Sequence, residues 1–181
     1  MIPSLDTPHF MELPIHSVGT AEHDNAVALF AGEDEDVVSR SHARLLISAA
    51  TQHGVETVAY RVHETGPRAR FPFVHTSAGD LPVDPAVLKE YCTSVLAAAA
   101  GGSVLISAVE EMPPAVQDRL IELLAGLEFA RTPSAAVRLI SGTTVSLLDR
   151  IAAGTFSEQL FYRLNIIHLT AGDSRREVAL V

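Results

Sequence analysis

Cysteine and positive charge are both scarce in this chain of 181 residues. The single cysteine, Cys92, excludes an internal disulfide and favours a reducing compartment, the cytoplasm. Its setting, "KEYCTSV", is typical of a helix face, which indicates a buried, inert thiol. Thirteen lysines and arginines stand against 22 acidic residues, a formal net charge of −9. Because nucleic-acid binding requires cations that displace counterions from phosphates, no direct nucleic-acid partner is expected.

Membrane and metal signals are lacking as well. The longest apolar run, residues 94–109, is interrupted by two glycines and is shorter than the roughly 20 residues that span a bilayer. The first residues, "MIPSLDTPHFMELP", lack the basic and then apolar pattern of a secretory signal. The eight histidines show no spacing typical of metal ligands. The sequence therefore predicts no membrane association and no metal site.

Apolar runs that alternate between strand-like and helix-like spacing make up most of the chain. They predict three parts: an extended lead-in at 1–24, an α/β core at 25–170 and a tail at 171–181. Continuously apolar strands separated by helices are typical of a mostly parallel sheet covered on both faces, a three-layer αβα domain. Strands are predicted at 25–32, 56–62, 71–76, 103–107, 136–143 and 165–169, and helices at 34–54, after Asp84, after Pro113, at 145–154 and at 156–164.

Residues 101–169 carry a more specific pattern. "GGSVLISAVEEMPPAVQDRLIELLAGLEFAR", "VRLISGTT" and "LLDRIAAGTFSEQLFYRLNII" follow one another in that order. They resemble the AAA+ domain of sigma-54-dependent (NtrC-like) transcription activators, the sigma-54 interaction domain. The resemblance implies a P-loop NTPase-like fold. Upstream, "VALFAGEDEDVVSRSH" resembles the family's phosphate-binding loop and "RFPFVHTSAGDLP" resembles its second strand.

The segment that resembles the phosphate-binding loop has the wrong chemistry for a phosphate. Gly32 is followed by Glu33 and three further acids, with no second glycine and no lysine. A phosphate loop needs glycines so that backbone N–H groups converge, and a lysine to neutralise the phosphates. Four carboxylates favour a helix N-terminus but repel a triphosphate. The segment is better explained as a capped helix start.

The residues that the family uses for hydrolysis are also replaced. Ser107 and Ala108 stand where the resemblance implies an Asp-Glu pair for magnesium and the attacking water. Alanine cannot act as a base, and phosphoryl transfer depends on accurate positioning. Glu110 and Glu111 lie beyond the strand end, and Glu111 matches a family acid that precedes the proline. Neither glutamate is expected to replace the missing pair.

Three further positions concern the γ-phosphate and the neighbouring subunit. Thr144 replaces a family asparagine that senses the γ-phosphate, and helix capping is its favoured role. Ser157 replaces the first of two arginines that the family donates to the next subunit, and Arg163 keeps the second. Arg163 is either a relic of that trans-acting finger or a structural residue paired with Glu158 or a helix end.

Two family parts are missing from the printed sequence. No "GAFTGA" loop lies between residues 73 and 102, and the chain ends at residue 181. The helical lid subdomain and the DNA-binding helices are therefore expected to be absent.

The sequence thus predicts a bacterial, cytoplasmic sigma-54 interaction-like domain with degenerate nucleotide motifs. We expect no cofactor and no ATP hydrolysis, and a role in transcriptional regulation by contact with a full-length sigma-54 activator or response regulator, in an oligomeric state left open. One alternative is a divergent ATP-binding sigma-54 activator domain completed by a partner subunit. Another is a scaffold module unrelated to sigma-54.

Overall fold

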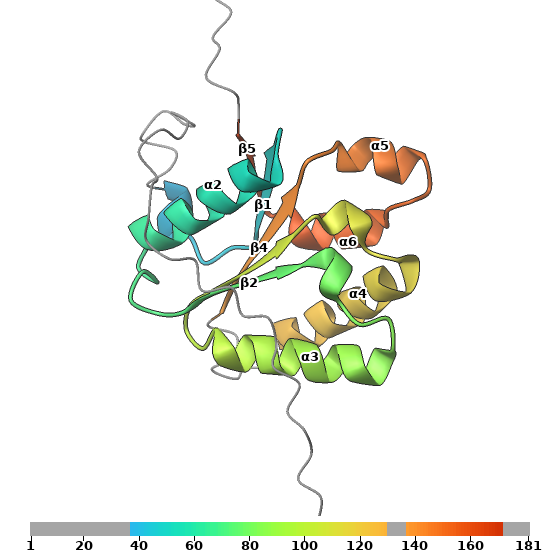
Figure 1. The fold of residues 1–181 in the computed structure, drawn as a ribbon, viewed down its shortest axis with the longest axis horizontal. Helices are drawn as coiled ribbons and strands as arrows, with labels where there is room; N and C mark the ends of the chain where they lie inside the picture. The colour runs from blue at the N-terminus through green and yellow to red at the C-terminus, as the bar shows by residue number, and fades with distance from the viewer. Residues whose placement is uncertain (1–36, 130–136, 172–181) are drawn as a thin grey trace, which may run out of the picture.

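A single parallel sheet forms the centre of the domain. The computed structural model describes residues 37–129 and 137–171, and within them the sheet has five strands in the order β2-β3-β4-β1-β5 (Figure 1). Every pairing is parallel. The strands are β1 (Leu45–Ala49), β2 (Phe73–Ser77), β3 (Ser103–Ser107), β4 (Arg138–Thr143) and β5 (Ile167–Ala171).

Helices cover both faces of this sheet. One face is covered by α2 (Gln52–Thr65), and the other by α3 (Pro85–Ala98), α4 (Pro114–Phe129) and α6 (Glu158–Leu164), with α5 (Leu147–Ala152) beside them (Figure 1). Short 3-10 turns, η1 (Ala78–Asp80) and η2 (Val109–Glu111), follow β2 and β3. None of the described helices is both long and apolar enough to cross a bilayer.

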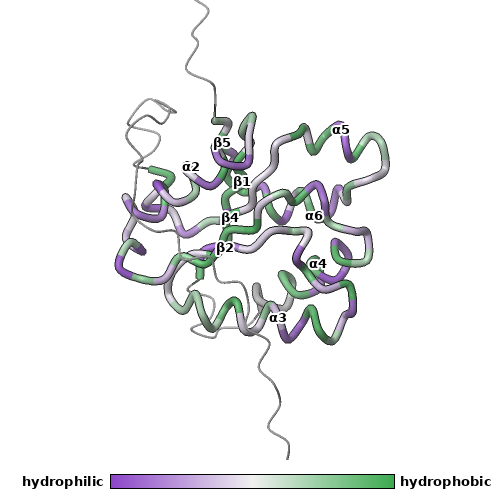
Figure 2. Tube along the Cα trace, in the orientation of Figure 1, coloured by the Kyte–Doolittle hydropathy of each residue, from purple (hydrophilic) through white to green (hydrophobic). Residues whose placement is uncertain are grey.

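Alternation along the strands divides the core in two. Leu45 and Ile47 of β1 pack in the cluster that contains the α2 valines, whereas Leu46 packs in the cluster beneath α3, α4 and α6. Successive side chains of a strand point to opposite faces, so one apolar run serves both layers. Hydrophobic segments accordingly run through the middle of the molecule (Figure 2). The predicted three-layer α/β fold is confirmed.

Two predicted elements are wrong. The stretch predicted as one helix at 34–54 is helical at 37–40 but contains β1, the strand that pairs with both β4 and β5. Its apolar residues recur at spacings that suit a helix, but "LLISA" is a short buried run that periodicity cannot distinguish from a strand. The strand predicted at 56–62 lies inside α2, and Gly54, predicted as a helix stop, lies in its first turn.

Most other predicted elements are confirmed with shifted ends. β2, β3, β4 and β5 lie within or beside the predicted strands, and α3 begins where Asp84 accepts hydrogen bonds from the N–H groups of Ala86 and Val87, at 2.9 and 3.0 Å. The strand predicted at 25–32, the lead-in at 1–24 and residues 172–181 of the tail lie outside the described residues, so the proposed part boundaries stay predictions.

Candidate functional site

The carboxyl ends of the central strands form the natural place for a ligand. In open parallel sheets, ligands bind beyond the carboxyl ends of the strands, at the point where the order of the strands in the sheet reverses. Here β1 lies between β4 and β5, α2 leaves it on one face, and the return to β5 passes through α6 on the other. The turns after β1, β3 and β4 therefore define the candidate site.

The turn after β1 has the strand–turn–helix geometry of a phosphate-binding loop. β1 ends at Ala49, α2 begins at Gln52, and the hydroxyl of Thr51 accepts the N–H of Gly54 at 3.1 Å. The loop pattern G-x-x-x-x-G-K fits here with Ala49 at the first glycine, Gly54 at the second and Val55 at the lysine. Gly32 and Glu33, predicted for this role, lie outside the described residues. Among the described residues, this turn is where the fold places such a loop.

Val55 cannot serve as the cationic anchor of that loop. Its side chain is 0% exposed and belongs to the core cluster under α2. A Cβ added at Gly142 of β4 would lie only 2.1 Å from Val55 Cγ1, so the valine packs directly on that strand. The position that carries the lysine in a working loop is therefore filled by an apolar contact.

The end of β3 carries a hydroxyl where the family resemblance implies a carboxylate. Ser107 is 4% exposed, and its Oγ lies 2.9 Å from His75 Nε2 on the neighbouring strand. Glu56 of α2 approaches the same nitrogen at 4.0 Å. Ala108, the next residue, has φ +52° and ψ +43°, a left-handed backbone that is uncommon for a residue other than glycine. Ser107 and Ala108 themselves therefore supply one buried hydroxyl and no carboxylate, and the ionisable groups beside them are His75 and Glu56.

Thr144 has a different role from the predicted helix cap. Its N–H and its hydroxyl both donate to Glu110 Oε1, at 3.0 and 2.9 Å. The N-cap of α5 is Ser146, whose hydroxyl accepts the N–H of Asp149. Glu110 leaves the strand end as expected, but its carboxylate turns back across the sheet edge. No donor from the described part of the chain reaches its other oxygen, which is buried.

The remaining predicted residues lie on η2 and α6, and the carbonyl of Arg163 accepts a hydrogen bond from Arg44, which precedes β1 at the opposite edge of the sheet. Glu111 is exposed in η2. Ser157 caps α6 by accepting the N–H of Leu160 at 3.3 Å, and its own N–H donates to Gln117. Arg163 lies in the last turn of α6, where a cation interacts favourably with the helix dipole. The structure thus brings Ser107, Glu110 and Thr144 to the strand ends and puts Ser157 and Arg163 on α6.

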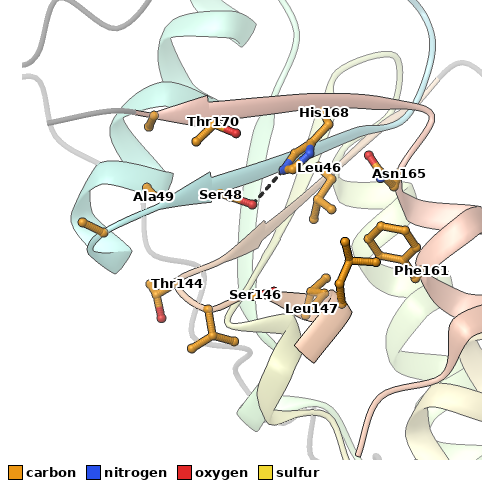
Figure 3. A pocket seen from close by; sticks show the side chains of 14 residues that line it. Leu46, Ser48, Ala49, Thr144, Ser146, Leu147, Phe161, Asn165, His168 and Thr170 are labelled. Carbon is orange, nitrogen blue, oxygen red and sulfur yellow. Dashed lines mark hydrogen bonds between the residues drawn. The ribbon is translucent and has the colours of Figure 1, made fainter. Parts of the chain in front are cut away.

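A cavity of about 420 Å³ opens beside the ends of β1 and β4, against β5, α5 and α6 (Figure 3). Ser48 Oγ and His168 Nε2 are 2.8 Å apart on its wall. Desolvation lowers the pKa of His168, although the residue as a whole is exposed. None of the described residues that line the cavity is an Asp, Glu, Lys or Arg. The cavity therefore offers hydroxyl groups, but no lysine or arginine, to a triphosphate.

Sequence reasoning missed Ser48, Asn165 and His168 as residues that line this cavity. The helix predicted at 34–54 placed Ser48 in a helix interior, whereas in the structure it lies near the end of a strand. For this reason Ser48 was not recognised as a candidate site residue. A correct strand at 45–49 would have placed Ser48 at the carboxyl edge, where ligand-binding residues are sought. The described residues contain no group of three or more His, Cys, Asp or Glu side chains arranged to hold a metal ion.

Comparison with known proteins agrees with the geometry. The fold is that of a P-loop NTPase: a solved P-loop NTPase domain of a sigma-54 activator from Escherichia coli aligns with a TM-score of 0.58 at 21% identity, over 80% of this chain and 93% of that chain. NtrX from Brucella abortus, solved in complex with ATP, aligns with a TM-score of 0.66 at 26% identity, over 83% of this chain and 39% of that chain.

The family follows from the sequence matches. The family described as "Sigma-54 interaction domain" matches residues 89–170. NtrC from Escherichia coli K12, a DNA-binding transcriptional regulator, is 33% identical over 161 residues, which cover 77% of this chain and 34% of NtrC. Residues 89–170 therefore match the sigma-54 interaction domain, the chain is similar to AAA+ sigma-54 activators, and it spans about a third of the length of such curated relatives.

Proposed function

We propose that this sigma-54 interaction domain has lost nucleotide handling and acts in transcriptional regulation by protein contact. The observation that carries the proposal is the buried Val55 at the position of the loop lysine. A triphosphate carries several negative charges, and a backbone loop without a cation compensates them only in part. Ser107 and Ala108 at the end of β3 add a hydroxyl but no carboxylate that could hold magnesium or act as a base toward water.

The surface of α6 supports the protein-contact part of the proposal. Tyr162 is 63% exposed on α6, and Ile166, just beyond the helix, is 58% exposed. Exposed large apolar and aromatic side chains beside an arginine are typical of interface positions. A full-length sigma-54 activator or response regulator in the bacterial cytoplasm is the proposed partner, since such proteins are the relatives of this domain.

Calorimetric titration of the full chain with ATP and with ADP, each with Mg²⁺, tests the loss of nucleotide handling. The expected result is no saturable heat. NtrX from Brucella abortus, which was solved in complex with ATP and with ADP, is the positive control and is titrated in the same buffer. Micromolar affinity for either nucleotide would overturn the proposal, whatever the hydrolysis rate.

The alternative is an ATP-binding domain that a partner subunit completes. Arg163 favours it, because this residue matches an arginine that the family donates in trans. Under this alternative, this chain alone shows no ATP turnover. Mixing it with a full-length activator raises the ATP turnover above that of the activator alone, and Arg163→Ala in this chain removes the increase. Our proposal predicts instead that this domain lowers the ATP turnover of the activator or leaves it unchanged. Arg163→Ala in this chain should then cause no loss of ATP turnover in the mixture.

A further inference from the structure

A second, larger cavity lies on the sheet face that α3 and α4 cover, in a groove between these two helices. It has a volume of about 570 Å³, within the range of about 300–1,000 Å³ that is typical of small-molecule sites. Its floor is the sheet face formed by β2, β3 and β4, and the two helices form its walls, side by side in Figure 1. This α3–α4 groove shares no lining residue with the cavity beside β1 and β5.

The floor of the α3–α4 groove is apolar with one polar anchor. Val104 and Ile106 of β3 and Leu120 of α4 are among the side chains at its base. Within this floor, Thr76 Oγ1 and Tyr91 OH lie 2.7 Å apart. An apolar surface that carries a small number of placed hydroxyls is the usual lining of a site for an organic ligand.

The charge of the rim differs in sign from that of the whole chain. Three cationic side chains line the groove, Arg44, Lys89 and Arg119, with Glu122 as the one carboxylate among the described lining residues. Glu122 forms an ion pair with Arg119. The rim is therefore net positive in a protein whose formal charge is −9. A ligand with an anionic head and an apolar body would match both parts of the groove.

We infer that the α3–α4 groove binds an amphipathic organic anion, a carboxylate with a medium-length apolar chain. The chain lies on the β3 and α4 side chains, and the carboxylate lies at the rim near Lys89. This inference goes beyond the proposed function and does not depend on whether the domain binds ATP. The groove shares no lining residue with the cavity beside the ends of β1 and β4, and it contains neither the turn after β1 nor Ser107.

Cys92 gives a direct probe of occupancy. It lines the groove and is the only cysteine in the chain. Burial raises the pKa of its thiol, so alkylation with N-ethylmaleimide is followed at mildly alkaline pH. Decanoate, added below its micelle concentration to the full chain, is expected to slow the alkylation of Cys92 in a saturable manner. Decanol, which lacks the charge, should bind about tenfold more weakly, a difference of about 1.4 kcal/mol.

A charge variant and its control separate the groove from general electrostatics. Lys89 is exposed on α3, and Lys89→Gln should weaken decanoate binding by about two- to fivefold while leaving decanol unchanged. Arg150→Gln makes the same change of charge on α5, away from the groove, and should leave both affinities unchanged.

Four outcomes would overturn the inference. Two concern the ligand: decanoate gives no saturable protection of Cys92, or decanoate and decanol bind with equal affinity. Two concern the protein: Lys89→Gln and Arg150→Gln weaken decanoate binding equally, or the alkylation of Cys92 slows as the protein concentration rises. The last would show that a second copy of the chain covers the groove.

Discussion

At the scale of single residues, the contact between Glu110 and Thr144 replaces what the family resemblance implies at the strand ends. One carboxylate oxygen holds both the N–H and the hydroxyl of Thr144 across 34 positions of sequence. Such a bridge ties the end of β4 to the turn after β3. The role of this contact is structural, because the Glu110 carboxylate holds two turns together and is not free to act as a base.

Glu110→Ala should therefore destabilise the domain by about 1–3 kcal/mol, because it leaves two partly buried donors of Thr144 without their acceptor. Chemical denaturation with urea measures the change. The neighbouring Glu111 is exposed, and Glu111→Ala is the matched control, expected to change the free energy of unfolding by less than about 0.5 kcal/mol. Equal effects of the two substitutions would contradict the contact.

Sequence reasoning could not find this bridge. The spacing between Glu110 and Thr144 has no local signature, and a threonine just before a helix is reasonably assigned as its cap. Ser146, two residues later, satisfies the same requirement, and only the packing of β3 beside β4 decides between them. The pair Ser48 and His168 is 120 positions apart and depends on the pairing of β1 with β5 in the same way.

At the scale of elements, the parts that were predicted correctly carry their own boundary signals. Asp84-Pro85 marks the start of α3, and Pro113-Pro114 marks the start of α4. β1 and α2 lack such clear signals. "ETVAYRV" alternates as a strand would, yet Val55, Val58 and Val62 also share one helix face, and that face is buried against the sheet. Because β1 was assigned to a helix and part of α2 to a strand, the phosphate loop was expected at residues 32–36.

The packing of α2 on the sheet leads to a prediction for Val55→Lys. A charged ammonium at this fully buried position would cost more than about 3 kcal/mol, since no carboxylate lies in the surrounding apolar cluster of described residues. Thermal unfolding followed by circular dichroism should show a large fall in Tm. Val83→Lys, at an exposed position before α3, should leave Tm nearly unchanged. A Val55→Lys protein of unaltered stability would mean that position 55 faces the solvent.

At the scale of the whole molecule, two histidines couple folding to pH. His63 is buried, with Nδ1 3.0 Å from Ser103 Oγ, and burial, aided by the positive charge of Arg68, lowers its pKa below 6.5. Desolvation lowers the pKa of His168 as well, although this residue is exposed. In the unfolded chain both rings take up a proton near pH 6.5, whereas the folded protein resists protonation.

The contribution of these two histidines to the free energy of unfolding should therefore be constant above about pH 6.5. It should fall as the pH decreases from that value through the lowered pKa values of the folded state. The buried His63 contributes a slope of up to about 1.4 kcal/mol per pH unit, and the exposed His168 contributes less because solvent screens its environment. Urea titrations between neutral and mildly acidic pH measure it. His63→Gln should reduce the slope, and the double variant with His168→Gln should reduce it further. An unchanged slope in the double variant would contradict the assignment.

Gly142 and Val55 constrain each other in a way that bears on the history of the domain. Any side chain at position 142 would collide with the valine, and the valine fills the space that the glycine leaves open. Substitutions at the two sites are therefore expected to occur together in relatives that share this packing. A larger residue at position 142 can therefore be accommodated only together with a smaller one at position 55.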